Sequence, residues 1–116
     1  MATDFRSGSD FPRRGRTALD GILWLARVAD KARAQAAGTI HDYIYPCPMD
    51  RGVFEHWQIT AADFDHAVRS NPTDDGLVTW LRSRVGPAKI EAANHWVTVV
   101  KTASLDRQDA EEGVAA

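Results

Sequence analysis

The chain has 116 residues, of which 44% are hydrophobic and 26% are charged, a composition typical of a single globular domain. Its formal net charge is −2, whereas nucleic-acid-binding domains usually carry a basic excess on one face, so we expect no nucleic-acid partner. No apolar run approaches the length of a membrane span and the first residues lack the hydrophobic stretch of a signal peptide, so the sequence predicts a cytoplasmic protein with no membrane partner.

Three stretches of different composition divide the chain. Residues 1–16 are polar and contain several arginines, and we expect a flexible N-terminal arm there, with Phe11 and Pro12 anchoring it to the body. Residues 17–103 carry the apolar side chains that a core requires and predict a single helical domain. Residues 104–116 are acidic and poor in large apolar groups, which predicts a disordered tail.

A long amphipathic helix is predicted from Thr17 to Gly38. Thr17 is a suitable N-cap, and Gly38 can take the left-handed conformation that ends many helices. At about 100° per residue, one arc of this helix is apolar. The arc comprises Leu19, Ile22, Leu23, Leu25, Ala26, Ala29, Ala32 and Ala36. Trp24, Arg27 and Lys31 lie on the opposite flank, where we expect them to be exposed to water.

Asp30 and Arg33 fall inside the apolar arc, which is an unfavourable place for two charges. Burying an ionised group is costly unless the group is paired, and residues three positions apart on a helix are close enough to pair with each other. Two interpretations remain open. Either the two residues form a structural ion pair, or they face a pocket in which Arg33 binds an anion and Asp30 orients it or accepts a proton.

Residues 39–50 predict a turn rich in proline and tyrosine. Pro46 and Pro48 favour extended backbone at the residues before them and make the turn rigid. Tyr43 and Tyr45 are two positions apart, so in an extended segment they point the same way. They line a pocket, or they pack on the first helix with their hydroxyl groups in water. The sequence leaves both arrangements open.

Cys47 is the only cysteine, so the chain forms no internal disulfide and suits a reducing compartment. It is a candidate nucleophile, with Arg33 and the start of the next helix as the groups that would activate its thiol. Alternatively, it is a small buried hydrophobic residue. The histidines are scattered, and no phosphate-binding loop or catalytic motif is present, so we expect neither a metal nor a cofactor.

Four further helices are predicted after the turn, over about 50–57, 60–71, 73–85 and 87–103. Asp50 is the expected N-cap of the first of these. Thr60 and Asp63 form a capping box at the second, Thr73 caps the third, and Pro87 suits the first turn of the last. Adjacent helices with short loops predict an all-α fold, an irregular bundle of about five helices with the proline- and tyrosine-rich turn after the first long helix.

Asn94 lies at the margin of the apolar side of the last predicted helix. Two roles are open for its amide. It hydrogen-bonds the backbone of a loop, or it contributes to the same pocket as Asp30.

The segments LDGILWLARVADKARAQAAGTIHDYIYPCPMD, TDDGLVTWLRSR and IEAANHW resemble the DUF5069 family of small bacterial proteins, over roughly residues 12–100. That family has a leucine- and arginine-containing helix with Asp-Lys-x-Arg, a tyrosine-rich turn ending in Cys-x-x-Asp, and an asparagine in its last helix. The matching residues here are Asp30, Lys31, Arg33, Tyr43, Tyr45, Cys47, Asp50 and Asn94. Family members often have proline before the helix arginine, where this chain has Ala26 before Arg27. The resemblance implies the fold and these candidate residues, and it implies no activity.

Two classes of function follow as hypotheses, and whether the protein is an enzyme stays open. In the first, the domain binds a small polar or anionic metabolite and acts on it without a cofactor, as a lyase, isomerase or hydrolase would. The substrate-binding residues are then Arg33, Tyr45 and Asn94, and the catalytic residues are Asp30, Tyr43 and Cys47. In the second, it is an accessory module that binds a protein partner through an exposed Trp24. A homodimer would suit so small a core.

Overall fold

The computed structural model describes residues 4–6, 11–41 and 43–112, and within these ranges its regular elements are all helical. The elements are α1 (Leu25–Ala37), α2 (Pro48–Trp57), α3 (Ala61–Ser70), α4 (Asp74–Arg84), α5 (Pro87–His95), the π-helical turn η1 (Trp96–Val100) and α6 (Thr102–Glu111). The predicted all-α irregular bundle is therefore confirmed, with six α-helices in the described ranges where about five were expected. None of these helices is long and apolar enough to cross a bilayer.

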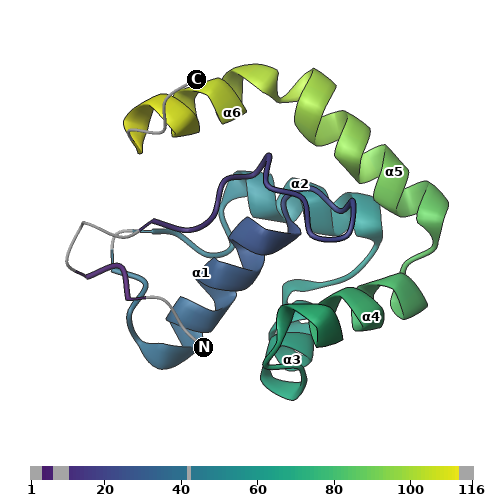
Figure 1. Ribbon diagram of the computed structural model, residues 1–116, viewed down its shortest axis with the longest axis horizontal. Helices are drawn as coiled ribbons and strands as arrows, with labels where there is room; N and C mark the ends of the chain where they lie inside the picture. The colour runs from purple at the N-terminus through teal and green to yellow at the C-terminus, as the bar shows by residue number, and fades with distance from the viewer. Residues whose placement is uncertain (1–3, 7–10, 42, 113–116) are drawn as a thin grey trace.

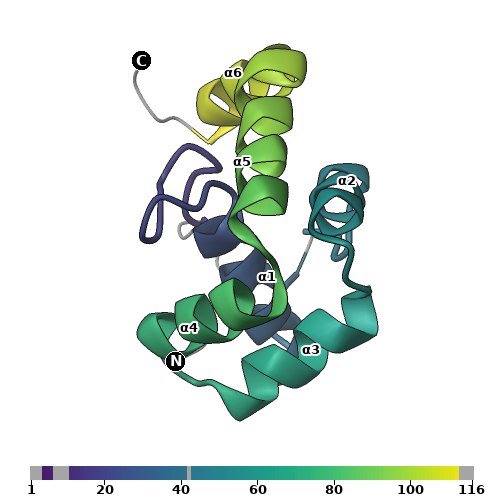
Figure 2. The same ribbon diagram turned by 90° about the vertical axis from the view of Figure 1, so that its right-hand side faces the viewer.

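Helix α1 lies at the centre of the bundle (Figure 1). Helices α3 and α4 pack below it, while α5 and α6 form an arch on the other side, above α2 (Figures 1 and 2). The segment that precedes α1 runs between α1 and this arch. Because α1 is covered on several sides, few of its residues reach water, and nine of its thirteen residues are buried.

The start of the first helix was predicted wrongly, since α1 begins at Leu25 and not at Thr17. Leu19 and Ile22 exchange two backbone hydrogen bonds, of 3.1 and 2.9 Å, across a tight turn. Asp20 and Gly21 between them have φ angles of 52° and 77°, the left-handed values of a type I′ turn. The apolar spacing that resembled a helix therefore comes from a turn whose two ends both pack against the core.

The flank of α1 that was expected to be exposed is buried. Trp24 is 0% exposed, Arg27 is 4% and Lys31 is 3%. The pattern of charges on one helix could not show that distant carboxylates cover these cations, Glu112 for Arg27 and Asp50 for Lys31. Trp24 is consequently a core residue, which removes the sequence argument for an exposed tryptophan that binds a protein partner.

The carboxylate of Asp50 is fully buried and joins α1 to the start of α2. It accepts hydrogen bonds from the Lys31 ammonium at 2.7 Å and from the Trp24 indole N–H at 2.8 Å. It also accepts the Cys47 backbone N–H at 3.0 Å, while the Asp50 N–H reaches the Cys47 Sγ at 3.4 Å. Cys47 is thus the N-cap of α2, and Asp50 is its capping-box partner rather than the N-cap that was predicted.

The caps of the later helices follow the prediction. Thr60 and Asp63 form the reciprocal capping box of α3, and Thr73 accepts the Gly76 N–H at the start of α4. Gly86 precedes Pro87 at the first position of α5. These caps depend on residues within three positions of one another, so the sequence alone was sufficient to identify them.

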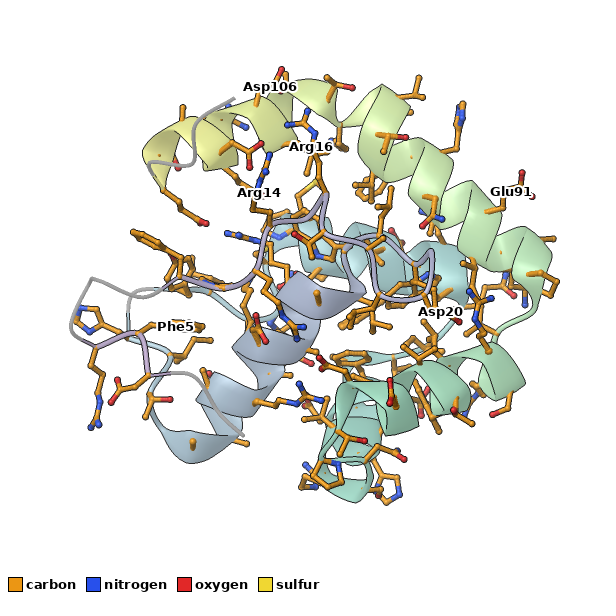
Figure 3. The ribbon with its side chains drawn as sticks, viewed as in Figure 1. Phe5, Arg14, Arg16, Asp20, Glu91 and Asp106 are labelled. Carbon is orange, nitrogen blue, oxygen red and sulfur yellow. The ribbon has the colours of Figure 1, made fainter. Side chains whose placement is uncertain are left out.

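The C-terminal part differs from the prediction of one helix to residue 103 and a disordered tail over 104–116. Helix α5 ends at His95, η1 follows, and Thr102–Glu111 forms α6. The acidic residues of α6 pair with arginines of the predicted N-terminal arm. Asp106 pairs with Arg16 at 2.7 Å (Figure 3). Asp109 pairs with Arg14 and Arg16 at 2.8 and 2.7 Å. Arginines of one segment are thus neutralised by aspartates of the other. Residues 113–116 lie outside the described residues.

We expect Asp50→Ala to lower the free energy of unfolding by about 3–5 kcal/mol, because it leaves the buried Lys31 ammonium without a counter-charge. Asp75→Ala is a matched control, since Asp75 is exposed in the first turn of α4, and it should cost less than about 1 kcal/mol. Urea unfolding followed by tryptophan fluorescence measures both. Similar losses in the two variants would contradict the central role of Asp50.

Candidate functional site

The predicted site residues do not come together in one site. Asp30 and Arg33 do not bond each other but belong to one chain of charges that crosses from the N-terminal segment to α4. Arg13 donates three hydrogen bonds to Asp30, from its backbone N–H, Nε and Nη2, at 2.8–3.0 Å. Asp74 accepts from Arg13 Nη1 and from Arg33 Nη1, both at 2.8 Å. Asp30 and Arg33 therefore both form ion pairs, as the structural interpretation expected. Their partners are Arg13 and Asp74, which are distant in sequence.

The free edge of Arg33 is the part of this network that the structure leaves open. Its Nε and Nη2 are shielded from solvent and have no hydrogen-bond partner among the described residues, and the side chain is 10% exposed. These two nitrogens form the fork that suits a carboxylate or a phosphate. No cavity described here has Arg33 in its wall.

Tyr43 and Tyr45 point to different partners and do not share a pocket wall. The Tyr43 hydroxyl donates to Glu112 at 3.4 Å, and its ring packs edge-on against Phe5. Burial raises the pKa of Tyr43 to about 12, so its hydroxyl stays protonated at neutral pH. The Tyr45 hydroxyl donates to Asp65 at 2.6 Å, and burial likewise raises its pKa.

The side-chain amide of Asn94 forms hydrogen bonds with the backbone of the turn before α1 through both its oxygen and its nitrogen. Its Oδ1 accepts the Leu23 N–H at 3.0 Å, and its Nδ2 donates to the Gly21 carbonyl at 2.9 Å. These are the bonds expected if Asn94 holds a loop. They fix the type I′ turn against α5, so Asn94 positions the fold and lies away from Asp30's network.

Cys47 is the predicted site residue that lies in the wall of a groove, of about 380 Å³, between the start of α2 and helix α6. We call it the Cys47 groove. Its wall comprises Cys47, Pro48, Met49, Trp96, Lys101, Ser104, Arg107, Gln108 and Glu111. The residues from α6 recur at three- and four-residue spacings and so form one face of that helix. Leu105, beside this face, is the buried residue of α6.

Trp96, the first residue of η1, packs against α2 and forms part of the groove wall. Its ring stacks on His56 with 5.0 Å between ring centroids, and the Lys101 ammonium lies 5.5 Å from its centroid. Gly52 makes this approach possible, because a Cβ at that position would lie 2.1 Å from the Trp96 ring. The indole also borders a second, more open groove beside His56 and His95. Trp96 therefore lines both grooves.

The charges that line the Cys47 groove have no ion-pair partners. Within the part of the chain that the structure describes, no carboxylate lies within 4 Å of the Lys101 or Arg107 cation, and Glu111 has no cation within that distance. Arg107 donates only to the Ser104 hydroxyl, at 3.4 Å. The Gln108 Oε1 is shielded from solvent and accepts no hydrogen bond. The Lys101, Arg107 and Glu111 charges, which unlike this oxygen reach solvent, are available to a ligand.

Sequence reasoning missed the α6 residues of this groove because it treated residues 104–116 as disordered. The available signal was the spacing of Ser104, Arg107, Gln108 and Glu111, which is that of one helical face. Metal binding has no comparable basis. No group of three His, Cys, Asp or Glu side chains in the described ranges is placed to hold a metal ion.

Comparison with known families gives a match over nearly the whole chain. The family described as "Domain of unknown function (DUF5069)" matches residues 9–116. No curated protein matches the chain. The match includes the whole Cys47 groove and the charge network around Asp74.

The pairing of Asp74 predicts a specific dependence of stability on pH. Hydrogen bonds from Arg13 lower the pKa of Asp74 from 3.8 to about 2, so its contribution is complete above about pH 4 and is lost as the pH falls towards 2. Asp74→Asn should cost about 1 kcal/mol at pH 7, after allowance for screening at a carboxylate that is 34% exposed. Urea midpoints of both proteins at pH 7, 4 and 2.5 measure the difference. A difference that is the same at all three pH values would refute this assignment.

Proposed function

The chain belongs to the DUF5069 family, and from this starting point we propose that it is a small-molecule-binding domain that holds a polar or anionic metabolite in the Cys47 groove. One observation carries the proposal. Lys101 and Arg107 line a groove of about 380 Å³ and have no ion-pair partner among the described residues, whereas most of the described arginines elsewhere are paired. Ligand sites of small molecules commonly have volumes of about 300–1,000 Å³.

The start of α2 borders the groove, and its capping box already uses the Cys47 and Asp50 backbone N–H groups. Helix N-termini present backbone N–H groups and the positive end of the helix dipole. Cys47, Pro48 and Met49, at this N-terminus, form one wall of the groove. Lys101 and Arg107 are the cations in the wall of the groove, so they carry the attraction for an anionic group.

Binding is supported better than turnover. Cys47 is the one thiol, and its Sγ already accepts the Asp50 N–H as the cap of α2. Asp30 and Tyr43, the other catalytic candidates, are engaged in the charge network and with Glu112, outside the groove. If the domain catalyses a lyase, isomerase or hydrolase reaction without a cofactor, Cys47 as nucleophile and Glu111 as proton acceptor are the groups in reach. We also propose a cytoplasmic location, which the single free cysteine supports.

The test uses Cys47 as a reporter, since it is the only cysteine. Iodoacetamide, which is neutral, alkylates the thiol, and mass spectrometry follows the rate while phosphate, citrate and small carboxylates are titrated. A bound anion should slow the alkylation and raise the melting temperature. In the Lys101→Gln/Arg107→Gln double variant, we expect the concentration needed for protection to rise about tenfold or more.

The control is the double variant Lys89→Gln/Arg69→Gln, which removes the same charge from two exposed residues outside the groove. It should behave like the parent. Equal loss of protection in both double variants would show a non-specific effect of net charge. No protection of the parent by any anion would refute the proposed site.

A further inference from the structure

We propose that α6 is a lid on the Cys47 groove, which ion pairs hold closed and which opens while helices α1 to α5 remain folded. The lid follows from how α6 is attached to the body and from the backbone at its junction with η1. The control of ligand entry by this lid rests on the proposed function.

Helix α6 buries little apolar surface. Leu105 is its buried residue, and the other residues of Thr102–Glu111 are exposed or half-buried. Leu105 lies against Gly15, where an added Cβ would come within 2.9 Å of its side chain. By contrast, α1 buries nine of its residues and α2 buries five. One leucine cannot offset the conformational entropy lost by a helix of ten residues, so α6 depends on other interactions.

These other interactions are mainly ionic. Arg16 bonds Asp106 and Asp109, and Arg14 bonds Asp109, with N···O distances of 2.7–2.8 Å. Three of the four side chains are partly exposed, at 37% for Arg14, 35% for Arg16 and 64% for Asp106. Water and salt screen ion pairs of this exposure. The attachment of α6 therefore weakens as ionic strength rises, whereas screening does not act on the apolar packing of α1 to α5.

The closed position of α6 also leaves polar atoms without partners. Arg27 donates to Glu112 from both terminal nitrogens, at 3.1 and 2.6 Å, but its Nε is shielded from solvent and has no acceptor. The Oε1 of Gln108, on α6, is likewise shielded and has no donor. A polar atom that loses water without gaining a partner opposes the arrangement that buries it. Opening returns the Gln108 oxygen to water, so this term favours the open state.

The chain can bend at Lys101, the residue between η1 and α6. Its φ and ψ are −109° and 24°, outside the helical range, and its N–H donates to the Trp96 carbonyl at 3.0 Å across a π-helical turn. Figure 1 shows the change of direction between α5 and α6. Residues at the ends of elements commonly act as hinges. Because the groove lies between α2 and α6, a rotation about Lys101 widens it and exposes Cys47.

A bound anion favours the closed state. Arg107 belongs to the lid, whereas Cys47 and Pro48 belong to the body, and all three line the groove. An anion that bonds Arg107 while it packs against the start of α2 makes both contacts only when α6 is closed. A ligand with this preference shifts the equilibrium towards the closed state, and opening of the lid weakens its binding by the same factor.

Hydrogen–deuterium exchange of the full-length protein, resolved by peptide mass spectrometry, tests the lid. A helix of ten residues is not stable alone in water, so the amides of residues 102–112 exchange whenever α6 opens. We compare about 0.05 M with about 0.5 M NaCl, between which the Debye length falls roughly threefold. Exchange of residues 102–112 should accelerate at the higher salt concentration, while exchange of residues 25–37 in α1 should not.

Asp109→Asn is the informative variant, because it removes the carboxylate that Arg14 and Arg16 share. At low salt it should accelerate exchange of residues 102–112 about fivefold, the effect of losing two partly exposed ion pairs. Asp75→Asn is the matched control, since Asp75 is exposed on α4, and it should exchange like the parent. If α1 accelerates together with α6, the helix opens only when the whole domain unfolds, and the lid is overturned. Unchanged exchange of α6 in Asp109→Asn overturns it as well.

Alkylation of Cys47 by N-ethylmaleimide, a neutral reagent bulkier than iodoacetamide, shows whether this movement opens the groove. Asp109→Asn should react faster than the parent and than Asp75→Asn. Faster exchange of α6 with an unchanged rate of alkylation would show that α6 moves without uncovering Cys47, which would refute its role as a lid on this groove.

Anions separate the lid from the function that it controls. At constant ionic strength, phosphate or citrate should slow exchange of residues 102–112 in the parent and leave α1 unchanged. If the variant and the salt dependence behave as expected but no anion slows exchange or protects Cys47, the proposed function fails and the lid stands. If an anion protects Cys47 while neither salt nor Asp109→Asn changes exchange of α6, the lid fails and the anion site stands.

Discussion

The buried carboxylate of Asp50 determines where the other parts of the molecule can lie. One oxygen accepts the Trp24 indole N–H at the start of α1, and the other accepts the Lys31 ammonium and the Cys47 backbone N–H. A buried ammonium without a counter-charge is strongly unfavourable, so Lys31 constrains α1 and α2 to this one register. The same contacts place Cys47 at the beginning of α2, and with it one wall of the groove. The interaction that stabilises the core therefore also positions the candidate site.

The elements that local signals determine were predictable from the sequence. Thr60 with Asp63, Thr73, and Pro87 all lie within a turn of the backbone groups that they cap or replace, and the helices they begin are in place. The turn at Asp20 carried an equally local signal, an Asp-Gly pair that favours a type I′ turn. The apolar periodicity around this turn also fits a helix, so the predicted helix began at Thr17, before the observed start at Leu25.

The environment of a charge was not predictable, because it depends on partners far along the chain. Arg27 and Lys31 have the spacing of a solvated helix face, yet their carboxylates come from residues 112 and 50. Asp30 and Arg33 were recognised as unusual, but their partners, Arg13 and Asp74, lie in a segment expected to be flexible and on another helix. The candidate site also depends on residues far apart in the chain. Cys47 was identified, whereas the residues of α6 that complete the groove were assigned to a disordered tail.

The pairs that attach α6 have an implication for the order in which the molecule assembles. Arg14 and Asp109 are separated by 95 positions, and Arg16 and Asp109 by 93. The entropy lost on closing a loop increases with its length, so contacts this distant form after the shorter-range packing of α1 against α3. During synthesis on a ribosome, the residues up to α4 can collapse around Trp24 before α6 emerges. A chain at that stage lacks the α6 wall of the Cys47 groove, together with the core side chains of Ile90, Val97 and Leu105.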